Sequence, residues 1–262
     1  MPTLFVPHGA GPCFFMDWNP PDTWRRMGDF LRGIVAMLPA RPTAIVIVSG
    51  HWEANAFTVG SGKHPSLVFD YNGFPPHTYR LSYPAPGDPA LAARVRTLLA
   101  DAGLPAADDA QHGYDHGVFI PLKLIAPDAD IPVVQLSLRA GLDVREHDAA
   151  GRALQPLRDE GVLVVGSGMS YHNMRGYGRA ESGPVSDRFD DWLSATLAID
   201  DPDERVARLA AWDAQPDGRA AHPREEHLMP LMVAAGAGGR SAGRHVLRDR
   251  VLGTTVSAFR FD

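Results

Sequence analysis

The chain has 262 residues, of which 45% are hydrophobic and 21% are charged, and its formal net charge is −6. This length and apolar content are enough to bury a sizeable core, and an acidic balance without a basic block argues against a surface built for nucleic acid. No stretch approaches the about 18 uninterrupted apolar residues that a membrane-spanning helix needs.

Cysteine use and the first residues bear on the cellular compartment. Cys13 is the single cysteine, so no intrachain disulfide can form, and this fits a reducing cytoplasm. The apolar stretch at residues 3–7 follows no charged segment and is too short for a secretory signal. We therefore expect a cytoplasmic protein without a membrane partner.

Apolar runs and helical periodicity alternate along the chain. Continuous β-branched runs predict buried parallel strands. In chain order the sequence predicts a strand at 3–6, a helix at 24–38 capped by Asp22, a strand at 44–48, a helix at 91–102, a strand at 131–138, a helix at 144–157, a strand at 162–165, helices at 188–197 and 204–212, a helix at 223–235 opened by Pro223, and a strand at 254–261. This alternation predicts an α/β fold, a single domain over residues 1–262 with a mostly parallel central sheet flanked by helices.

One segment, residues 64–87, has little periodicity but five aromatic residues and several prolines. A loop of this length is often functional, and its dense aromatics argue against disorder. Two interpretations stay open. The segment is either an ordered flap that covers a planar substrate, with Phe74 in contact with it, or a surface loop packed over an edge of the core.

Five histidines, each beside small or turn-forming residues, are the most informative feature of the sequence: His8, His51, His116, His172 and His227. Ligands of open α/β sheets collect at the carboxyl ends of the strands. Three of the five, His8, His51 and His172, follow predicted strands, so we expect them to meet at one edge of the sheet. His227 is expected in the first turns of the 223–235 helix, and His116 after a loop that also holds His112 and Asp115.

Imidazole is the commonest metal ligand and also an acid or base near neutral pH. The candidate carboxylates nearby in the sequence are Glu53, Asp115, Glu225 and Glu226. A carboxylate either completes a metal site or holds the far nitrogen of a ligating imidazole, and the sequence leaves both roles open. We expect structural roles for four other histidines, His64, His77, His147 and His245, and leave His112 and His222 undecided.

A series of short motifs, in this order, resembles the class III extradiol ring-cleavage dioxygenases, in particular the single-chain DOPA-dioxygenase-like family. The resemblance covers nearly the whole chain. The motifs are Pro7-His8-Gly9-Ala10, Ser49-Gly50-His51-Trp52, Asn72-Gly73-Phe74-Pro75, Tyr83-Pro84-Ala85-Pro86-Gly87, Asp115-His116-Gly117, Gly166-Ser167-Gly168, His172-Asn173 and Glu226-His227-Leu228-Met229-Pro230-Leu231.

The resemblance implies a non-haem metal enzyme that opens catechols beside the diol with O2. It implies that His8, His51 and His227 hold the metal, with Fe(II) expected and Zn(II) as the alternative. His172 is either a fourth ligand or an acid/base, and His116 is a second catalytic candidate. Trp52, Phe74, Tyr171 and Asn173 are candidate substrate contacts. We also consider a homodimer.

The sequence also departs from the family pattern. His227 stands where better-known relatives use a carboxylate, and an all-histidine shell suits zinc as well as iron. The first motif reads Pro-His-Gly-Ala-Gly where Gly-His-Gly-Ser-Pro is common, so the substrate is expected to differ. Two alternatives remain: a zinc-dependent hydrolase that uses the same histidines, and a non-enzymatic member that kept the cavity and binds a ligand or protein.

Overall fold

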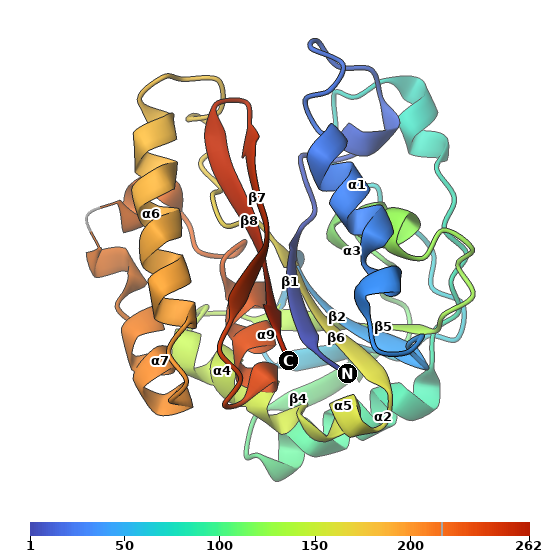
Figure 1. The fold of residues 1–262 in the computed structure, drawn as a ribbon. Coiled ribbons are helices and arrows are strands. Elements are labelled where there is room, and N and C mark those ends of the chain that lie inside the picture. Colours follow the sequence, from blue (N-terminus) through green and yellow to red (C-terminus); the bar gives the residue numbers. More distant parts are fainter. Residues whose placement is uncertain (216) are drawn as a thin grey trace.

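The computed structural model describes residues 1–215 and 217–262, and across these ranges eight strands form one sheet in the order β4-β3-β5-β2-β6-β1-β8-β7 (Figure 1). The strands are β1 Thr3–Pro7, β2 Ala44–Ala54, β3 Phe57–Gly60, β4 Ala106–Asp109, β5 Val133–Arg139, β6 Val162–Gly168, β7 Arg244–Val251 and β8 Thr254–Phe261. The α/β class predicted from the sequence is confirmed.

The prediction of a mostly parallel sheet is wrong, because the sheet is mixed. Its centre is parallel: β2 pairs with β5 and β6, and β6 pairs with β1. Antiparallel pairs flank this centre, where β3 meets β5 and where β8 meets β1 and β7. The sequence predicted the buried central strands from their β-branched runs, whereas β4 and β7 carry too many polar residues to show such a run and β3 has only four residues.

Strand β7 is hard to detect in the sequence because it is an exposed edge strand. Its arginines at 244, 248 and 250 are exposed, while Leu247 and Val251 face the core. Charges on an edge strand discourage pairing with another chain. Leu252 and Gly253 both have positive φ angles, 48° and 84°, as a two-residue hairpin turn to β8 requires.

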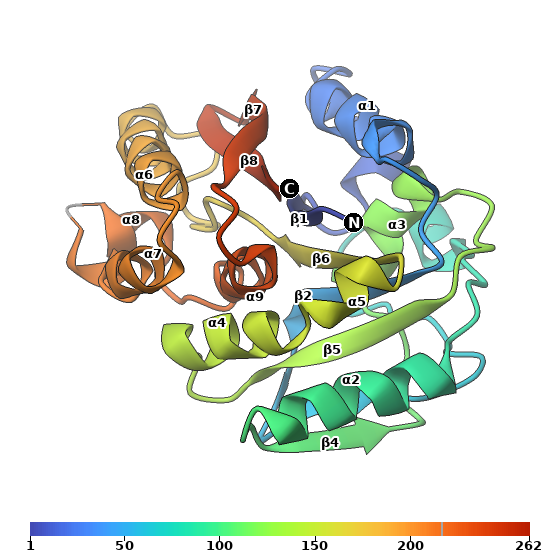
Figure 2. The ribbon, with the colours of Figure 1, turned by 60° about the horizontal axis from the view of Figure 1, so that its bottom comes forward.

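Helices cover both faces of the sheet (Figure 2). The α-helices are α1 Arg25–Gly33, α2 Pro89–Asp101, α3 His116–Ile125, α4 Val144–Ala153, α5 Pro156–Asp159, α6 Ser182–Leu197, α7 Pro202–Leu209, α8 Gly218–Ala221 and α9 Met229–Gly238. Helices α1 and α3 lie on one face, and α4, α6, α7 and α9 lie on the other. Within the described ranges, no helix has the length and apolar character needed to cross a bilayer.

Two helix boundaries differ from the prediction, those of α9 and α1, and the first of them changes the place of His227. Helix α9 begins at Met229, not at Pro223, and Pro230 is the proline in its first turn. His227 therefore lies in a turn before the helix. Every residue of α9 is buried, because the helix is enclosed between the sheet and α4, so it has no polar face to mark its start.

Helix α1 begins at Arg25 after Trp24, and Asp22 contributes no side-chain cap.

The segment at 64–87 is ordered and almost free of regular structure, apart from a short 3-10 helix, η3 Pro76–Arg80. Tyr71 and Tyr83 are buried, and Tyr71 packs against Phe74 and Phe119. Tyr71, Asn72 and Phe74 line the cavity that also holds the five histidines. The segment therefore lines that cavity and also covers the core, and its contact with a planar substrate stays a prediction.

Candidate metal centre

Three adjacent parallel strands place the histidines. His8 directly follows β1, and its backbone N–H donates to the carbonyl of Gly168 at the end of β6. His51 lies within β2, where the register with β5 shifts between Val48 and Glu53. An irregularity of this kind redirects a side chain, and such irregularities are common beside active sites. His8 and His51 thus reach the same edge of the sheet, as the sequence predicts.

His227 reaches this edge because glycines let its turn lie directly against two strands. A Cβ atom on Gly168 would lie 2.1 Å from the carbonyl oxygen of His227, and one on Gly50 would lie 3.3 Å from the Cα atom of His227. The same carbonyl accepts a hydrogen bond of 3.1 Å from the Met169 backbone N–H. Side chains at 50 and 168 would push the turn away.

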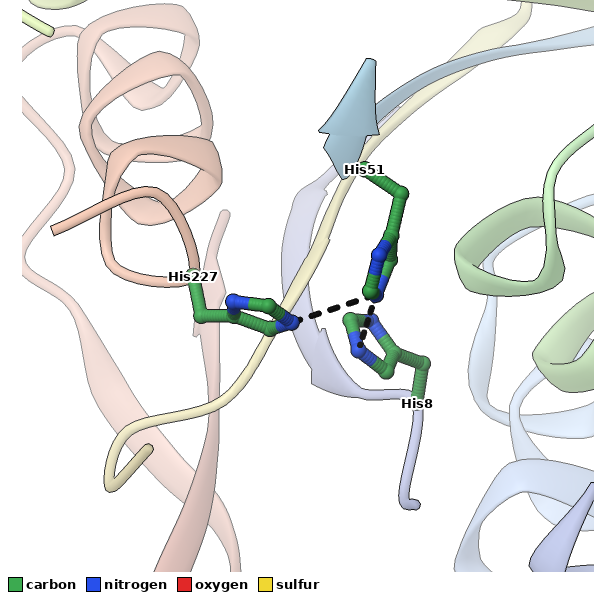
Figure 3. A group of neighbouring side chains, drawn as sticks. All are labelled: His8, His51 and His227. Carbon is green, nitrogen blue, oxygen red and sulfur yellow. Dashed lines mark hydrogen bonds between the residues drawn. The ribbon is translucent and has the colours of Figure 1, made fainter. Parts of the chain in front are cut away.

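The Nε2 atoms of the three histidines face one another (Figure 3). Nε2 of His51 lies 3.3 Å from Nε2 of His8 and 3.1 Å from Nε2 of His227. Two nitrogens that are each about 2.1 Å from one ion lie about 3.0–3.4 Å apart when their bonds meet at about 90–109°. The spacing of these side chains therefore fits a single transition-metal ion.

The other ring nitrogen of each histidine has a partner that sets the tautomer. The Ser167 hydroxyl donates to the Gly117 carbonyl, so it accepts from Nδ1 of His8 at 3.2 Å. Nδ1 of His227 donates to Oε1 of Glu226 at 3.0 Å, and Nδ1 of His51 lies 3.5 Å from Oδ2 of Asp70. With the protons on Nδ1, three Nε2 lone pairs point at one another, which a shared cation would stabilise.

Burial keeps these imidazoles neutral. It lowers the pKa of His8 and His51, and the neighbouring histidines lower both further. Burial also lowers the pKa of His227 to about 4, although the hydrogen bond to Glu226 acts in the opposite direction. Because a metal binds the neutral ring, these shifts favour metal binding at neutral pH.

His116 is the first residue of α3, and a carboxylate absent from the sequence-based candidates holds it in place. Nδ1 of His116 lies 2.8 Å from Oδ1 of Asp70, which also accepts from the His116 backbone N–H at 3.0 Å. Burial opposes ionisation of Asp70, but the hydrogen bonds and charge of His116 outweigh it and lower its pKa. Asp70 therefore joins His116 to His51. In the sequence, the only hint of this role is that Asp70 lies between two aromatic residues of the flap, Phe69 and Tyr71.

A second carboxylate joins His172 to His227 in the same way. The His172 ring stacks on the His227 ring with centroids 3.4 Å apart, and its Nδ1 lies 3.5 Å from Oε1 of Glu226. Burial works against ionisation of Glu226, but the contacts with His172 and His227 prevail and lower its pKa. The sequence left two roles open for a carboxylate, metal ligand or partner of a ligating imidazole. Glu226 contacts the Nδ1 atoms of His227 and His172, so its contacts are those of the second role.

The other candidate carboxylates are engaged elsewhere. Asp115 is buried, where it accepts from the Ser49 hydroxyl at 2.7 Å and from the Gln135 amide, and burial raises its pKa to about 6. Glu53 pairs with Arg224 at 2.6 Å, and Glu225 pairs with Arg219 at 2.6 Å. Asp115 thus fixes the strands beneath the histidines, and the two glutamates form ion pairs around them.

A cavity of about 270 Å³ opens onto the histidines. Besides the five histidines, it is lined by residues 9–11, Tyr71, Asn72, Phe74, Met174 and Tyr177. Of the four predicted substrate contacts, Phe74 belongs to this lining and the other three do not. Trp52 stacks on His112 at 3.7 Å, Tyr171 is buried, and the Asn173 side chain donates to the Ala220 carbonyl.

Several histidines outside the cavity make structural contacts. Buried His147 accepts from the Arg139 backbone N–H and bonds the Asp143 carbonyl through its other nitrogen. His222 is buried against Phe189 and bonds the Ser170 carbonyl. The spatial cluster thus consists of the five histidines singled out in the sequence.

Known proteins similar to this chain now bear on what the cluster does. Residues 3–260 match the family described as the catalytic LigB subunit of aromatic ring-opening dioxygenase. The chain is 35% identical to a 4,5-DOPA dioxygenase extradiol from Beta vulgaris, over 94% of this chain and 90% of that protein. It is 36% identical to the protein of the same name from Escherichia coli K12, over 90% and 85% of the two chains.

The fold is similar to a solved structure as well. A crystal structure of an uncharacterised protein from Escherichia coli K12 superposes with a TM-score of 0.79 at 31% sequence identity, and the match covers all of both chains. Neither the hydrolase nor the non-enzymatic alternative is favoured by these similarities. The chain belongs to the LigB family and is an extradiol aromatic ring-opening dioxygenase, as the motifs around its histidines predict.

Proposed function

We propose that the protein opens the ring of a catechol with O2 at an Fe(II) ion held by His8, His51 and His227. The observation that carries the proposal is the convergence of three Nε2 atoms whose Nδ1 protons are engaged elsewhere. Three protein ligands leave positions open, and bound Fe(II) would supply them for both catechol oxygens and for O2. Every other role falls to the side chains around the cavity.

His172 is the proposed base that removes a proton from the catechol. Its Nδ1 faces Glu226, so Nε2 is the nitrogen with a free lone pair. Its ring lines the cavity and is held by the stack on His227, which fixes its orientation before substrate arrives. We propose this role in preference to that of a fourth ligand, because the Nε2 atoms that converge are those of His8, His51 and His227, whereas His172 is grouped with Glu226 and His227.

His116 is the proposed second acid/base group. It lines the cavity, its ring centroid is 3.9 Å from that of His51, and Asp70 fixes its Nδ1 proton. Ring opening would need a proton donor as well as a base, and both His116 and His172 line the cavity from which a proton can be donated. Phe74 and Tyr71 would cover the planar ring of the substrate from the flap.

The test of the proposed function is aerobic incubation of the iron-reconstituted protein with a panel of catechols. A yellow semialdehyde product is the expected result, with one O2 consumed per ring opened. The same mixture without O2 should stay colourless, and zinc-loaded protein should be inactive. Turnover that persists without O2 would point to hydrolysis and contradict the proposal.

Asp70→Asn tests whether the flap carboxylate orients the two histidines that it joins. The amide keeps the shape but loses the charge that holds the Nδ1 protons of His51 and His116, so we expect metal affinity or kcat to fall about 10–100-fold. Iron content and the pH profile of kcat would be measured together. Asp130→Asn, which alters an exposed ion pair with Arg41, is the matched control.

If Asp70→Asn matched the control in both iron content and pH profile, Asp70 would have no orienting role.

Two further proposals concern the location of the protein in the cell and its assembly. We propose a cytoplasmic protein, supported by the single buried Cys13, and a homodimer, which sedimentation at several protein concentrations would test.

A further inference from the structure

The segment 171–177 contributes to the walls of two different cavities. His172, Met174 and Tyr177 line the cavity of the histidine cluster, whereas residues 171, 173, 175 and 176 line a second cavity of about 430 Å³. The first turn of α6 also borders the second cavity, which shares no lining residue with the first. The chemistry of the second cavity is therefore separate from that of the metal centre.

Two buried hydroxyl groups of the second cavity have no hydrogen-bond partner within the described ranges. They belong to Tyr171, which is 1% exposed, and to Ser182, which is 6% exposed, and both residues line the cavity. Neither hydroxyl is sealed off by protein atoms, so both are open to the cavity. A Cβ atom on Gly176 would collide with the Tyr171 hydroxyl and lie 2.7 Å from Oγ of Ser182, so the glycine leaves the space between them free. A buried hydroxyl without a partner is unfavourable, and a ligand in this space would supply one.

Positive charge surrounds the two hydroxyls. Arg175 and Arg179 both line the cavity and are exposed, and Arg175 makes no ion pair with the described residues. Arg179 lies 3.7 Å from Glu181, but both side chains are mostly exposed, and such a pair is weak. Glu181 makes no side-chain cap on α6 and the first turn holds no acidic residue, so the positive end of this 16-residue helix is not neutralised there. The cavity thus favours an anion, although the chain as a whole has a net charge of −6.

We propose that the second cavity binds a tetrahedral oxyanion, either a free sulfate or phosphate ion or the phosphoryl group of a small organic phosphate. Tyr171 and Ser182 donate hydrogen bonds from below, and Arg175 and Arg179 supply charge from the rim. Donors from four residues match an anion with three or four acceptor oxygens better than a planar carboxylate with two. The site goes beyond the proposed ring opening and does not depend on it.

The proposed site is connected to the histidine cavity through the backbone of the shared segment. The Gly176 backbone N–H donates to the Asn173 carbonyl at 2.8 Å, and the Tyr177 hydroxyl donates to the Tyr171 carbonyl at 2.9 Å. An anion held by Tyr171 and Arg175 would restrain the turn that these bonds close. We expect slower amide hydrogen exchange across residues 171–182 in saturating sulfate than in chloride of equal ionic strength. Unchanged exchange in this segment would contradict the site.

Titration calorimetry of the iron-loaded protein, without O2 and at constant ionic strength, tests binding directly with sodium sulfate as the probe. We expect saturable binding of one sulfate per chain. Arg179→Gln should weaken it at least about tenfold, because a charge-assisted hydrogen bond is lost, and Tyr171→Phe about two- to tenfold, because a neutral one is lost. Arg145→Gln, which changes an exposed arginine of α4 outside the cavity, is the matched control and should bind sulfate as the wild type does.

Non-saturable binding, or saturable binding that neither Arg179→Gln nor Tyr171→Phe weakens, would overturn the proposal. Phenyl phosphate in the same titration distinguishes the two sources of the oxyanion. Tighter binding than sulfate, with the same dependence on Arg179 and Tyr171, would assign the site to an organic phosphate, and weaker binding would assign it to the free ion. Ring opening of a catechol is not needed for any of these readouts, so they stand apart from the test of the proposed function.

Discussion

Replacing His51 with alanine is expected to strip the protein of its metal. His51 is the central member of the cluster, because its Nε2 is within 3.3 Å of His8 and within 3.1 Å of His227. With His51 removed, only His8 and His227 of the proposed ligands remain, and two imidazoles should bind the ion too weakly for it to survive gel filtration. We expect bound iron to fall from about one ion per chain to background, and ring opening to be lost with it.

The matched control for this change is His64→Ala, an exposed histidine at the start of the flap, which should keep its iron. Because His51 is also packed against His116, circular dichroism has to show that the fold survives the substitution. Folded His51→Ala protein that retained a full equivalent of iron would remove His51 from the ligand set.

Replacing His172 with phenylalanine is expected to leave the metal in place and to slow ring opening about 10²–10⁴-fold, the usual contribution of a general acid/base. The new ring can keep the stack on His227, whose centroid is 3.4 Å away, so the fold and the neighbouring histidines should be preserved. Iron content and single-turnover rates across pH would be measured on the same sample.

His112→Phe makes the same replacement at another stacked histidine, which lies against Trp52 outside the cavity, and its turnover should match the wild type. The iron content distinguishes the two roles considered for His172. Loss of iron together with activity would make it a ligand, whereas near-normal turnover would show that it is neither a ligand nor the base.

The central strands were predictable because burial on both faces selects unbroken β-branched runs, and β8 matched its predicted range of residues. Strands β3, β4 and β7 were missed for two reasons: β3 and β4 have only four residues each and pair with segments far away in sequence, and β7 is a charged edge strand. Helix α3 was missed for a different reason. It is buried on nearly every side and contains Pro121, so the sequence shows neither a polar face nor an uninterrupted helical pattern there.

The shared edge of the sheet at which the histidines lie could be predicted from the sequence, whereas the carboxylates that contact their far nitrogens could not. Histidines at the ends of neighbouring parallel strands must share an edge, and His8, His51 and His172 line the same cavity there. Asp70 could not be predicted as their partner, because the flap that carries it has no regular pattern to fix its position. The start of α9 was misplaced because two prolines, Pro223 and Pro230, were equally suited to a first turn.

The order of the strands has a consequence for how the protein acquires its metal. Strand β1 is enclosed between β6 and β8, with Thr3 opposite Val164 on one side and Phe261 on the other. His8 cannot take its place until these distant segments have been synthesised and have closed around it. A metal held by His8 and His227, as proposed, would therefore bind only late in folding, and once bound it would tie β1 to the turn before α9.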